Sequence, residues 1–367
     1  MLRLTFLTLP LLVTVVFMFA LRPLARGLGL IDRPGGRKNH VGEVPVIGGL
    51  AMLAGIGVGG ILSPELVESY PYFLAAIVIL VVVGAVDDRY ELPASVRFLA
   101  QACAALIMIY GADLVAYDIG RVLFGGDIRL GWFAPIFTLL LVLTAINAFN
   151  LFDGSDGVAG VQALIALTFL GFAAIMGGVM HALPLIANLI GVVFGFLIFN
   201  WPSQRTHSVR AFMGDAGSTM LGFALAWVSV DLSQWPTRAL TPMVVLWIFA
   251  LPVFDLFSSM FRRVRAGRSP FHADSEHLHH VLKRLGLSSR RVAQVILLAS
   301  VASAAFGVGG YLLGLGDGVL FVIWILGLAG YHLVFGSGLV IKRRAELRQE
   351  IEEIDETDSF ELWRQRR

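Results

Sequence analysis

Long apolar runs alternate with short polar segments along most of this chain. Eleven of the runs approach the roughly 20 residues that a helix needs to cross the hydrocarbon layer of a membrane. They cover about residues 4–21, 46–62, 71–86, 94–111, 131–149, 158–177, 181–199, 214–230, 241–259, 291–313 and 317–337. We therefore predict an all-α integral membrane protein, a bundle of about 11 transmembrane helices in one polytopic domain over residues 1–341.

Composition supports this class of protein. Hydrophobic residues make up 57% of the chain, against roughly 45–50% in soluble domains, and charged residues 15%, against roughly 25%. This balance excludes an ordinary soluble protein, although the length alone would allow two or three soluble domains. The single cysteine, Cys103, lies inside an apolar run, so the chain has no disulfide framework.

The distribution of basic residues predicts the orientation. With the N-terminus outside, the alternating spans place 24 of the 28 Lys and Arg residues on one side, which the positive-inside rule makes cytoplasmic. The charged tail over 342–367 falls on that side and has helical apolar spacing, so we predict a cytoplasmic amphipathic helix there. Glycines punctuate the longest external segment, 112–130, which predicts a small periplasmic hairpin.

The densest polar cluster between two apolar runs is the stretch 147–160, Asn-Ala-Phe-Asn-Leu-Phe-Asp-Gly-Ser-Asp-Gly-Val-Ala-Gly. Asn147, Asn150 and Asp153 recur every three residues, so they share one side of a helix end. Gly154 and Gly157 then break the helix and let the backbone approach a ligand closely. A helix C-terminus with added carboxylates favours a hard divalent cation, whereas the alternative is a plain polar turn between two spans.

Two further acidic clusters fall at the same predicted membrane face. Asp87 and Asp88 end the third run, and such a pair can ionise unequally, which suits a base, although a solvated turn would also explain it. Asp215 lies in Phe-Met-Gly-Asp-Ala-Gly-Ser, 212–218, where glycines and free helix amides predict a phosphate-binding nest; a simple N-cap is the alternative. Because Asp215 lies at the depth of Asn150, we predict that these two residues hold Mg²⁺ or Mn²⁺.

Two basic loops complete the cytoplasmic face. The loop after the ninth run ends in His277-Leu-His-His280, which has neither the cysteines nor the spacing of a zinc site, and so favours contacts with phosphate and sugar oxygens. The earlier loop, 33–49, is rich in glycine and basic residues. Binding to lipid head groups, or topology alone, would also explain these charges.

These motifs resemble a known family, the polyprenyl-phosphate N-acetylhexosamine-1-phosphate transferases. The resemblance covers about residues 33–286 and rests on four motifs in order: Asp87-Asp88, 147–157, 212–218 and 277–280. It implies a helical membrane bundle with a cytoplasmic cleft, in the bacterial inner membrane. The last loop, with Arg268-Ser-Pro-Phe before the histidines, is similar to the branch that uses UDP-GlcNAc for O-antigen, enterobacterial common antigen or teichoic acid linkage.

The reaction that the resemblance implies is transfer of N-acetylhexosamine 1-phosphate from a UDP-sugar to undecaprenyl phosphate, with UMP as the leaving group. Phe212 would stack on uracil, Asp156 would accept a hydrogen bond from the base, and Arg89 or Arg97 would replace a phosphate-binding lysine. The predicted catalytic residues are Asp87, Asp88, Asp153, Asp156 and His279; the predicted substrate-binding residues are Phe212, Asn147, Arg89, Arg268, His277, His280, Arg37 and His40; the predicted metal ligands are Asp215 and Asn150.

Three other functions stay open at this point. The peptidoglycan branch of the same family would transfer phospho-MurNAc-pentapeptide. A cation transporter would place its carboxylates near the middle of the membrane, whereas these lie at one interface. A scaffold for glycan assembly would leave the four motifs unexplained. We expect no nucleic-acid partner, and the sequence does not decide between a monomer and a homodimer.

Overall fold

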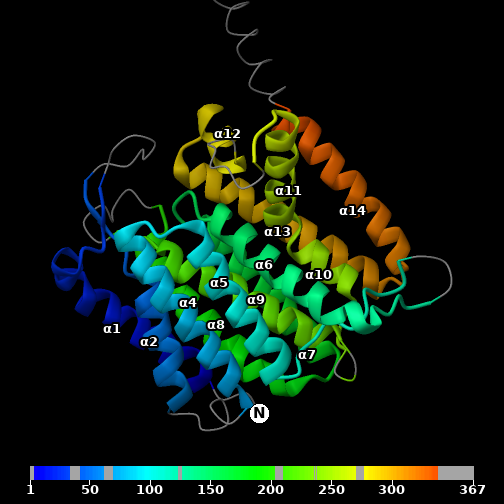
Figure 1. The fold of residues 1–367 in the computed structure, drawn as a ribbon, viewed down its shortest axis with the longest axis horizontal. Coiled ribbons are helices and arrows are strands. Elements are labelled where there is room, and N and C mark those ends of the chain that lie inside the picture. The colour runs from blue at the N-terminus through cyan, green and yellow to red at the C-terminus, as the bar shows by residue number, and fades with distance from the viewer. Residues whose placement is uncertain are drawn as a thin grey trace, which may run out of the picture.

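The computed structural model describes residues 4–33, 42–61, 69–122, 126–202, 210–234, 236, 238–269 and 277–337. Each of the eleven predicted runs contains helix within these residues. The helices are α1 (Thr5–Leu28), α2 (Gly48–Ile61), α4 (Pro71–Tyr90), α5 (Ala94–Leu106), α6 (Ala134–Phe152), α7 (Val158–Met176), α8 (Leu183–Asn200), α9 (Gly214–Ser233), α10 (Pro242–Ile248), α11 (Ala250–Arg265), α12 (Leu278–Arg284), α13 (Ser289–Leu312) and α14 (Asp317–Tyr331) (Figure 1).

The prediction of an all-α multi-pass membrane protein is confirmed. Among the described residues, nine helical segments are long and apolar enough to cross a membrane, and a tenth span results if α10 and α11 count as one. The one remaining predicted run, 46–62, corresponds to α2, which has only 14 residues. The tail over 342–367, which we predicted to be helical, lies outside the described residues.

The predicted span over 241–259 is broken in the structure, because α10 and α11 meet at an angle of 79°. Pro252 has no N–H to donate to the carbonyl of Ile248. Gln162 Nε2 donates to that oxygen instead, at 3.2 Å. The two preceding carbonyls accept hydrogen bonds from Trp324 Nε1 at 3.0 Å and Ser303 Oγ at 2.6 Å. Side chains of three other helices therefore satisfy the broken backbone, as a buried break in a membrane protein requires.

Burial divides the bundle into a centre and two edges. Helix α9 is almost entirely enclosed, whereas α1 and α14 are the most exposed of the long helices and lie at opposite edges (Figure 1). The exposed side chains on these edges include Leu12 and Val16 of α1 and Leu326 of α14. Apolar side chains can face outward at this density because lipid, and not water, surrounds them.

A two-stranded antiparallel ladder ties the first loop to the bundle. Strand β1 (Ile31–Asp32) pairs with β2 (Val44–Pro45). The chain after β2 forms a parallel bridge to Phe212, whose N–H donates to the Pro45 carbonyl at 2.9 Å. Pro45 and Val46 are thus anchored beside the 212–218 motif, although 167 positions separate Pro45 from Phe212 in the sequence.

The external segment folds back on itself, as predicted. Ile119 N–H donates to the Ile128 carbonyl at 3.1 Å, and Ile128 N–H donates to the Gly120 carbonyl at 3.0 Å. An ion pair of 3.3 Å between Arg238 and Asp118 joins this hairpin to the segment between α9 and α10. The hairpin therefore closes the end of the bundle that is opposite to the acidic motifs.

Candidate functional site

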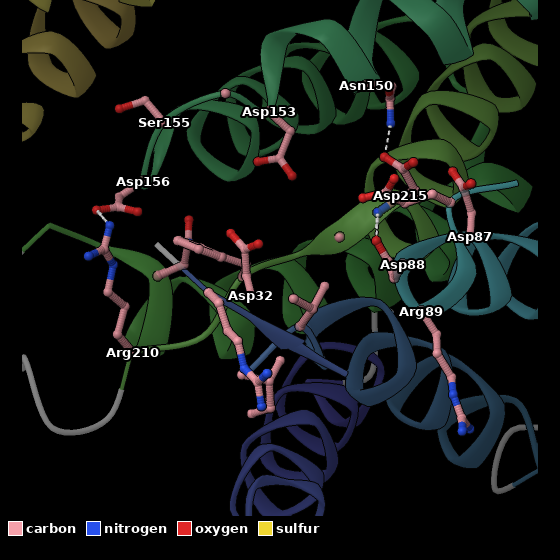
Figure 2. Close-up of a pocket in the computed structure, with 18 of the residues that line it drawn as sticks. Asp32, Asp87, Asp88, Arg89, Asn150, Asp153, Ser155, Asp156, Arg210 and Asp215 are labelled. Carbon is pink, nitrogen blue, oxygen red and sulfur yellow. Dashed lines mark hydrogen bonds and ion pairs between the residues drawn. The ribbon is translucent and has the colours of Figure 1, made fainter. Parts of the chain in front are cut away.

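The ends of seven helices surround a polar cavity of about 790 Å³. The prediction that the acidic motifs share one face is confirmed, because all of them contribute to this cavity (Figure 2). The predicted site residues that line it are Asp87, Asp88, Arg89, Asn150, Asp153, Asp156, Phe212, Asp215 and His280.

Asp88 caps the start of α9. Its Oδ1 accepts a hydrogen bond from the N–H of Asp215 at 2.8 Å, and its Oδ2 accepts one from the N–H of Ala216 at 3.3 Å. Gly214 makes this approach possible, because its φ is +71° and a Cβ there would lie 2.4 Å from Asp88 Oδ2. The predicted phosphate nest at this helix start was therefore wrong, since a carboxylate of the protein already takes two of the free amides.

The two predicted metal ligands do meet. Asn150 Nδ2 donates to Asp215 Oδ1 at 2.6 Å, so the end of α6 and the start of α9 bring an amide and a carboxylate together (Figure 2). Arg97, at the start of α5, lies 3.6 Å from Asp215 Oδ2 and 3.3 Å from Asp87 Oδ2. Asp87 also accepts a hydrogen bond from Leu92 N–H at 2.6 Å. Arg97 therefore holds two carboxylates that would otherwise repel each other.

Asp153 points into the middle of the cavity from the end of α6 (Figure 2). Desolvation raises the pKa of its carboxyl well above the ordinary value, and the charges of Asp215, Asp88 and Asp156 raise it further. Such a crowd of carboxylates attracts a cation. Within the part of the chain that the structure describes, no three His, Cys, Asp or Glu residues already stand in the geometry of a metal site.

Asp156 and Arg210 form an ion pair at the opposite end of the polar cavity (Figure 2). The Arg210 guanidinium also lies over the Phe212 ring, 5.1 Å from the ring centre. Sequence reasoning counted Arg210 only as a basic loop residue, although its place two residues before Phe212 was a usable signal. Asp156 is thus already engaged by a cation, and one face of Phe212 is covered.

Lys283 of α12 also lines this end of the cavity. Burial lowers the pKa of its ammonium group, Asp156 opposes that shift, and Arg210 adds to it. Sequence reasoning counted Lys283 among the loop charges and gave it no role. Together with Arg210 it supplies positive charge where an anionic ligand would enter.

Asn200 is a third residue that sequence reasoning missed. Its Oδ1 accepts from Gly157 N–H at 2.7 Å, and its Nδ2 donates to the Ala211 carbonyl at 2.9 Å. Gly157 has a φ of +77°, a conformation that suits glycine. This buried amide therefore braces the 147–160 stretch against the segment that leads to Phe212.

A second cavity, of about 580 Å³ and mostly apolar, runs between α4, α5, α6, α9 and α11. It shares six residues with the polar cavity: Asp87, Arg97, Asn150, Gly154, Asp215 and His280. Asn147 lies on this second cavity and donates to Gln101 Oε1 at 2.7 Å, so it does not face the polar one. The two cavities therefore meet at the charged residues of the site.

His277, His279 and His280 form a row beside the second cavity. The ring centres are 6.0 Å apart for the first pair and 4.2 Å apart for the second. Among the described residues, neither ring nitrogen of the buried His279 has a hydrogen-bond partner. Burial, followed by His280, His277 and Lys283, lowers the pKa of His279 well below its ordinary value, so this ring is neutral at pH 7.

Gly154 adjoins this histidine row. A Cβ at Gly154 would lie 2.1 Å from His279 Nε2, so the glycine gives room to a histidine of the protein. Gly154 also lines both cavities, so close approach of a ligand at this glycine stays a prediction.

Two predicted arginines, Arg89 and Arg268, lie away from the carboxylates. Arg89 stacks over its neighbour Tyr90 at 4.7 Å and points away from the acidic cluster (Figure 2). Arg268 is exposed after α11 and, in the part of the chain described, lines neither cavity. Arg37 and His40 lie outside the described residues, whereas Arg33 of the same loop does line the polar cavity.

The fold and the site define a multi-pass membrane protein in which an acidic, polar cavity opens into an apolar one. The sequence model of glycosyl transferase family 4 matches residues 70–233. A protein of Yersinia pestis named undecaprenyl-phosphate alpha-N-acetylglucosaminyl 1-phosphate transferase is 32% identical over 90% of this chain and 89% of its own length. Proteins with the same name from Pasteurella multocida, 34% identical over 85% and 87%, and Salmonella typhi, 32% identical over 81% of each chain, are also similar. The chain belongs to glycosyl transferase family 4, so the resemblance that the four motifs indicated is confirmed.

Proposed function

We propose that this protein transfers N-acetylglucosamine 1-phosphate from UDP-GlcNAc to undecaprenyl phosphate. The single observation that carries the proposal is the junction of a polar cavity with an apolar one at Asp87, Arg97, Asn150, Gly154, Asp215 and His280. A nucleotide sugar needs a polar, cation-bearing cleft, whereas a polyprenyl chain needs an apolar groove that opens to the membrane. The printed names of the relatives support the same two substrates.

In this reaction a phosphate oxygen of the lipid attacks the β-phosphorus of UDP-GlcNAc. A new P–O bond forms at the β-phosphorus, the bond between the β-phosphorus and the bridging oxygen breaks, and UMP leaves with that oxygen and the electron pair. Two anions must approach each other, so positive charge is needed on both sides. Arg210 and Lys283 line the polar cavity, and Arg97 lines both cavities. These cations can hold the nucleotide and the lipid phosphate before the reaction.

Asp87 and Asp88 hold other groups in place under this proposal. The second pKa of a phosphate monoester is roughly 6, so the lipid phosphate is mostly a dianion at pH 7 and needs no general base. Asp87 pairs with Arg97, and Asp88 caps α9. We therefore assign Asp87 to the placement of Arg97 and Asp88 to the placement of Asp215.

Mg²⁺ fits the residues present, with Asp215 and Asn150 as its protein ligands. Mg²⁺ is usually bound through one or two carboxylates, substrate phosphates and water, so a cage of three protein ligands is not required. The amide and carboxylate already converge at 2.6 Å, and the raised pKa of the neighbouring Asp153 indicates a place where added positive charge is favoured. When bound, the ion would neutralise charge on the diphosphate; Mn²⁺ would suit the same oxygen ligands.

We place the site on the cytoplasmic side of a bacterial inner membrane. The positive-inside rule supports this orientation, because the basic loops lie at the same end of the bundle as the acidic motifs. A nucleotide sugar is a cytoplasmic metabolite, so a site on the cytoplasmic side can reach it. The position of the acidic motifs at one end, together with a buried polar cavity, favours an enzyme over a cation transporter.

A purified preparation tests the proposal directly. The protein would be incubated in lipid nanodiscs with Mg²⁺, undecaprenyl phosphate and UDP-GlcNAc, and the products identified by mass spectrometry. We expect equimolar UMP and lipid-linked GlcNAc diphosphate. Formation of UDP with a lipid monophosphosugar, or no lipid product at all, would contradict the proposed reaction.

A further inference from the structure

We propose that Asp255 and Tyr331 are positioning residues that hold the histidine row of α12 against the phosphate of the lipid substrate. This inference rests on the function proposed above. It assigns a task to a buried carboxylate in the second half of the bent helix pair and to the last helix, neither of which belongs to the four motifs.

Asp255 joins three helices through one carboxylate. It lies on α11 and is only 3% exposed. Its Oδ2 is 2.8 Å from His277 Nδ1, and its Oδ1 accepts from Leu278 N–H at 2.9 Å. The hydroxyl of Tyr331, at the end of α14, donates to the same Oδ1 at 2.8 Å. The start of α12 and the end of α14 are therefore both fixed to one point on α11.

This contact determines how the His277 ring is oriented. An ionised carboxylate only accepts hydrogen bonds, so the nitrogen facing Asp255 must carry a proton. This contact restricts rotation of the His277 ring. The His279 ring lies nearly parallel to it, at an angle of 11°, so the orientation of His277 is passed on to the next ring by packing.

Holding the histidine row in place matters most for His279. It is 2% exposed, and among the described residues both of its ring nitrogens lack a partner. Two unsatisfied polar atoms at such a depth carry a free-energy cost unless a ligand completes them. His277 and His279 line only the apolar cavity, which we assign to the lipid. A phosphate brought in by that lipid would supply the missing acceptor.

The free-energy cost of burying the Asp255 carboxylate argues that it does more than pack the helices together. A buried carboxylate with three donors can often be replaced by apolar side chains without loss of stability. Here it holds His277 beside the buried ring of His279, at the wall of the apolar cavity.

The substitution Tyr331→Phe tests the inference, since it removes one hydroxyl and leaves the ring. Loss of one hydrogen bond should loosen the histidine row and raise the KM for undecaprenyl phosphate about fivefold. The KM for UDP-GlcNAc should stay within about twofold, because His277 and His279 do not line the polar cavity. A smaller fraction of folded enzyme would lower Vmax and leave both KM values unchanged.

Phe335→Leu is the matched control. Phe335 packs on the Tyr331 ring at 5.2 Å but makes no contact with Asp255 among those described, so its loss should lower thermal stability and leave both KM values unchanged. Asp255→Asn should raise the KM for the lipid more than Tyr331→Phe does; if it fails to fold, Tyr331→Phe decides. Equal KM values for the lipid in wild type and Tyr331→Phe, or the same rise in the control, would overturn the inference. An inactive wild type would overturn the proposed function itself, and this inference with it.

Discussion

Asp88 accepts a hydrogen bond from the backbone N–H of Asp215 at 2.8 Å, across 127 positions of sequence. The acidic pair at the end of α4 thereby fixes the start of α9, which carries a proposed metal ligand. Replacement of Asp88 by Ala should cost about 1–2 kcal/mol of stability, as loss of an N-cap does, and should also reduce activity. Asp88→Asn, which keeps one accepting oxygen, should be milder. Thermal unfolding of both variants in detergent checks this prediction; unchanged stability with lost activity would instead indicate direct contact with substrate.

Asp215 should be essential for turnover but not for folding. Asp215→Ala removes a carboxylate oxygen that we propose as a metal ligand, while the backbone N–H that Asp88 caps remains. We expect loss of transferase activity, a melting temperature close to that of wild type, and no response to added Mg²⁺. Asp32→Asn changes another carboxylate that lines the polar cavity and serves as the control. Near-normal turnover of Asp215→Ala with the usual Mg²⁺ dependence would refute the assignment.

The crowding around Asp153 predicts how stability depends on pH. Its folded-state pKa is raised, so the stabilisation is complete below the unfolded-state value of about 3.9 and is lost as pH rises through the folded-state value. In EDTA the melting temperature should therefore fall with rising pH, and Mg²⁺ should restore it more strongly at higher pH. Asp153→Asn should flatten the EDTA curve. Parallel pH curves in EDTA for wild type and this variant would show that Asp153 is not the group responsible.

Phe212 is the candidate for contact with uracil. One face of its ring is covered by Arg210, so a base can stack only on the remaining surface of the ring. Phe212→Ala should raise the KM for UDP-GlcNAc by about tenfold, the loss of one stacking contact, and change the KM for undecaprenyl phosphate much less. Steady-state kinetics with each substrate varied in turn gives both values. Equal changes in the two KM values would indicate a packing role for the ring.

The choice of sugar separates the two branches of the family. The loop that ends in His277 and His280 shows no added segment for a peptide, and the named relatives act on N-acetylglucosamine 1-phosphate. We expect product with UDP-GlcNAc and none with UDP-MurNAc-pentapeptide when the two are offered in separate reactions. His279→Ala should lose activity in the first reaction while UMP still binds. A lipid that carries the pentapeptide would overturn the branch and leave the reaction class intact.

The sequence by itself determined the class of protein and the end of the bundle that holds the site. Span length and apolar composition are local properties, because each helix must be long enough for the membrane and satisfy its own backbone. Because successive spans cross the membrane in alternate directions, their order alone predicted that Asp87, Asn150 and Asp215 lie on the same side. Their convergence on one cavity was therefore predictable without a structure.

Only the tertiary structure decided which polar groups satisfy one another. The structure shows that the Asp88 carboxylate caps α9, so the amides beside Asp215, which look free in the sequence, are already taken. Arg210 and Asn200 belong to the site because of partners far away in the sequence, Asp156 and Gly157. A buried donor or acceptor must find a partner somewhere, but any of many distant residues can meet that need, and the linear order of residues does not say which one does.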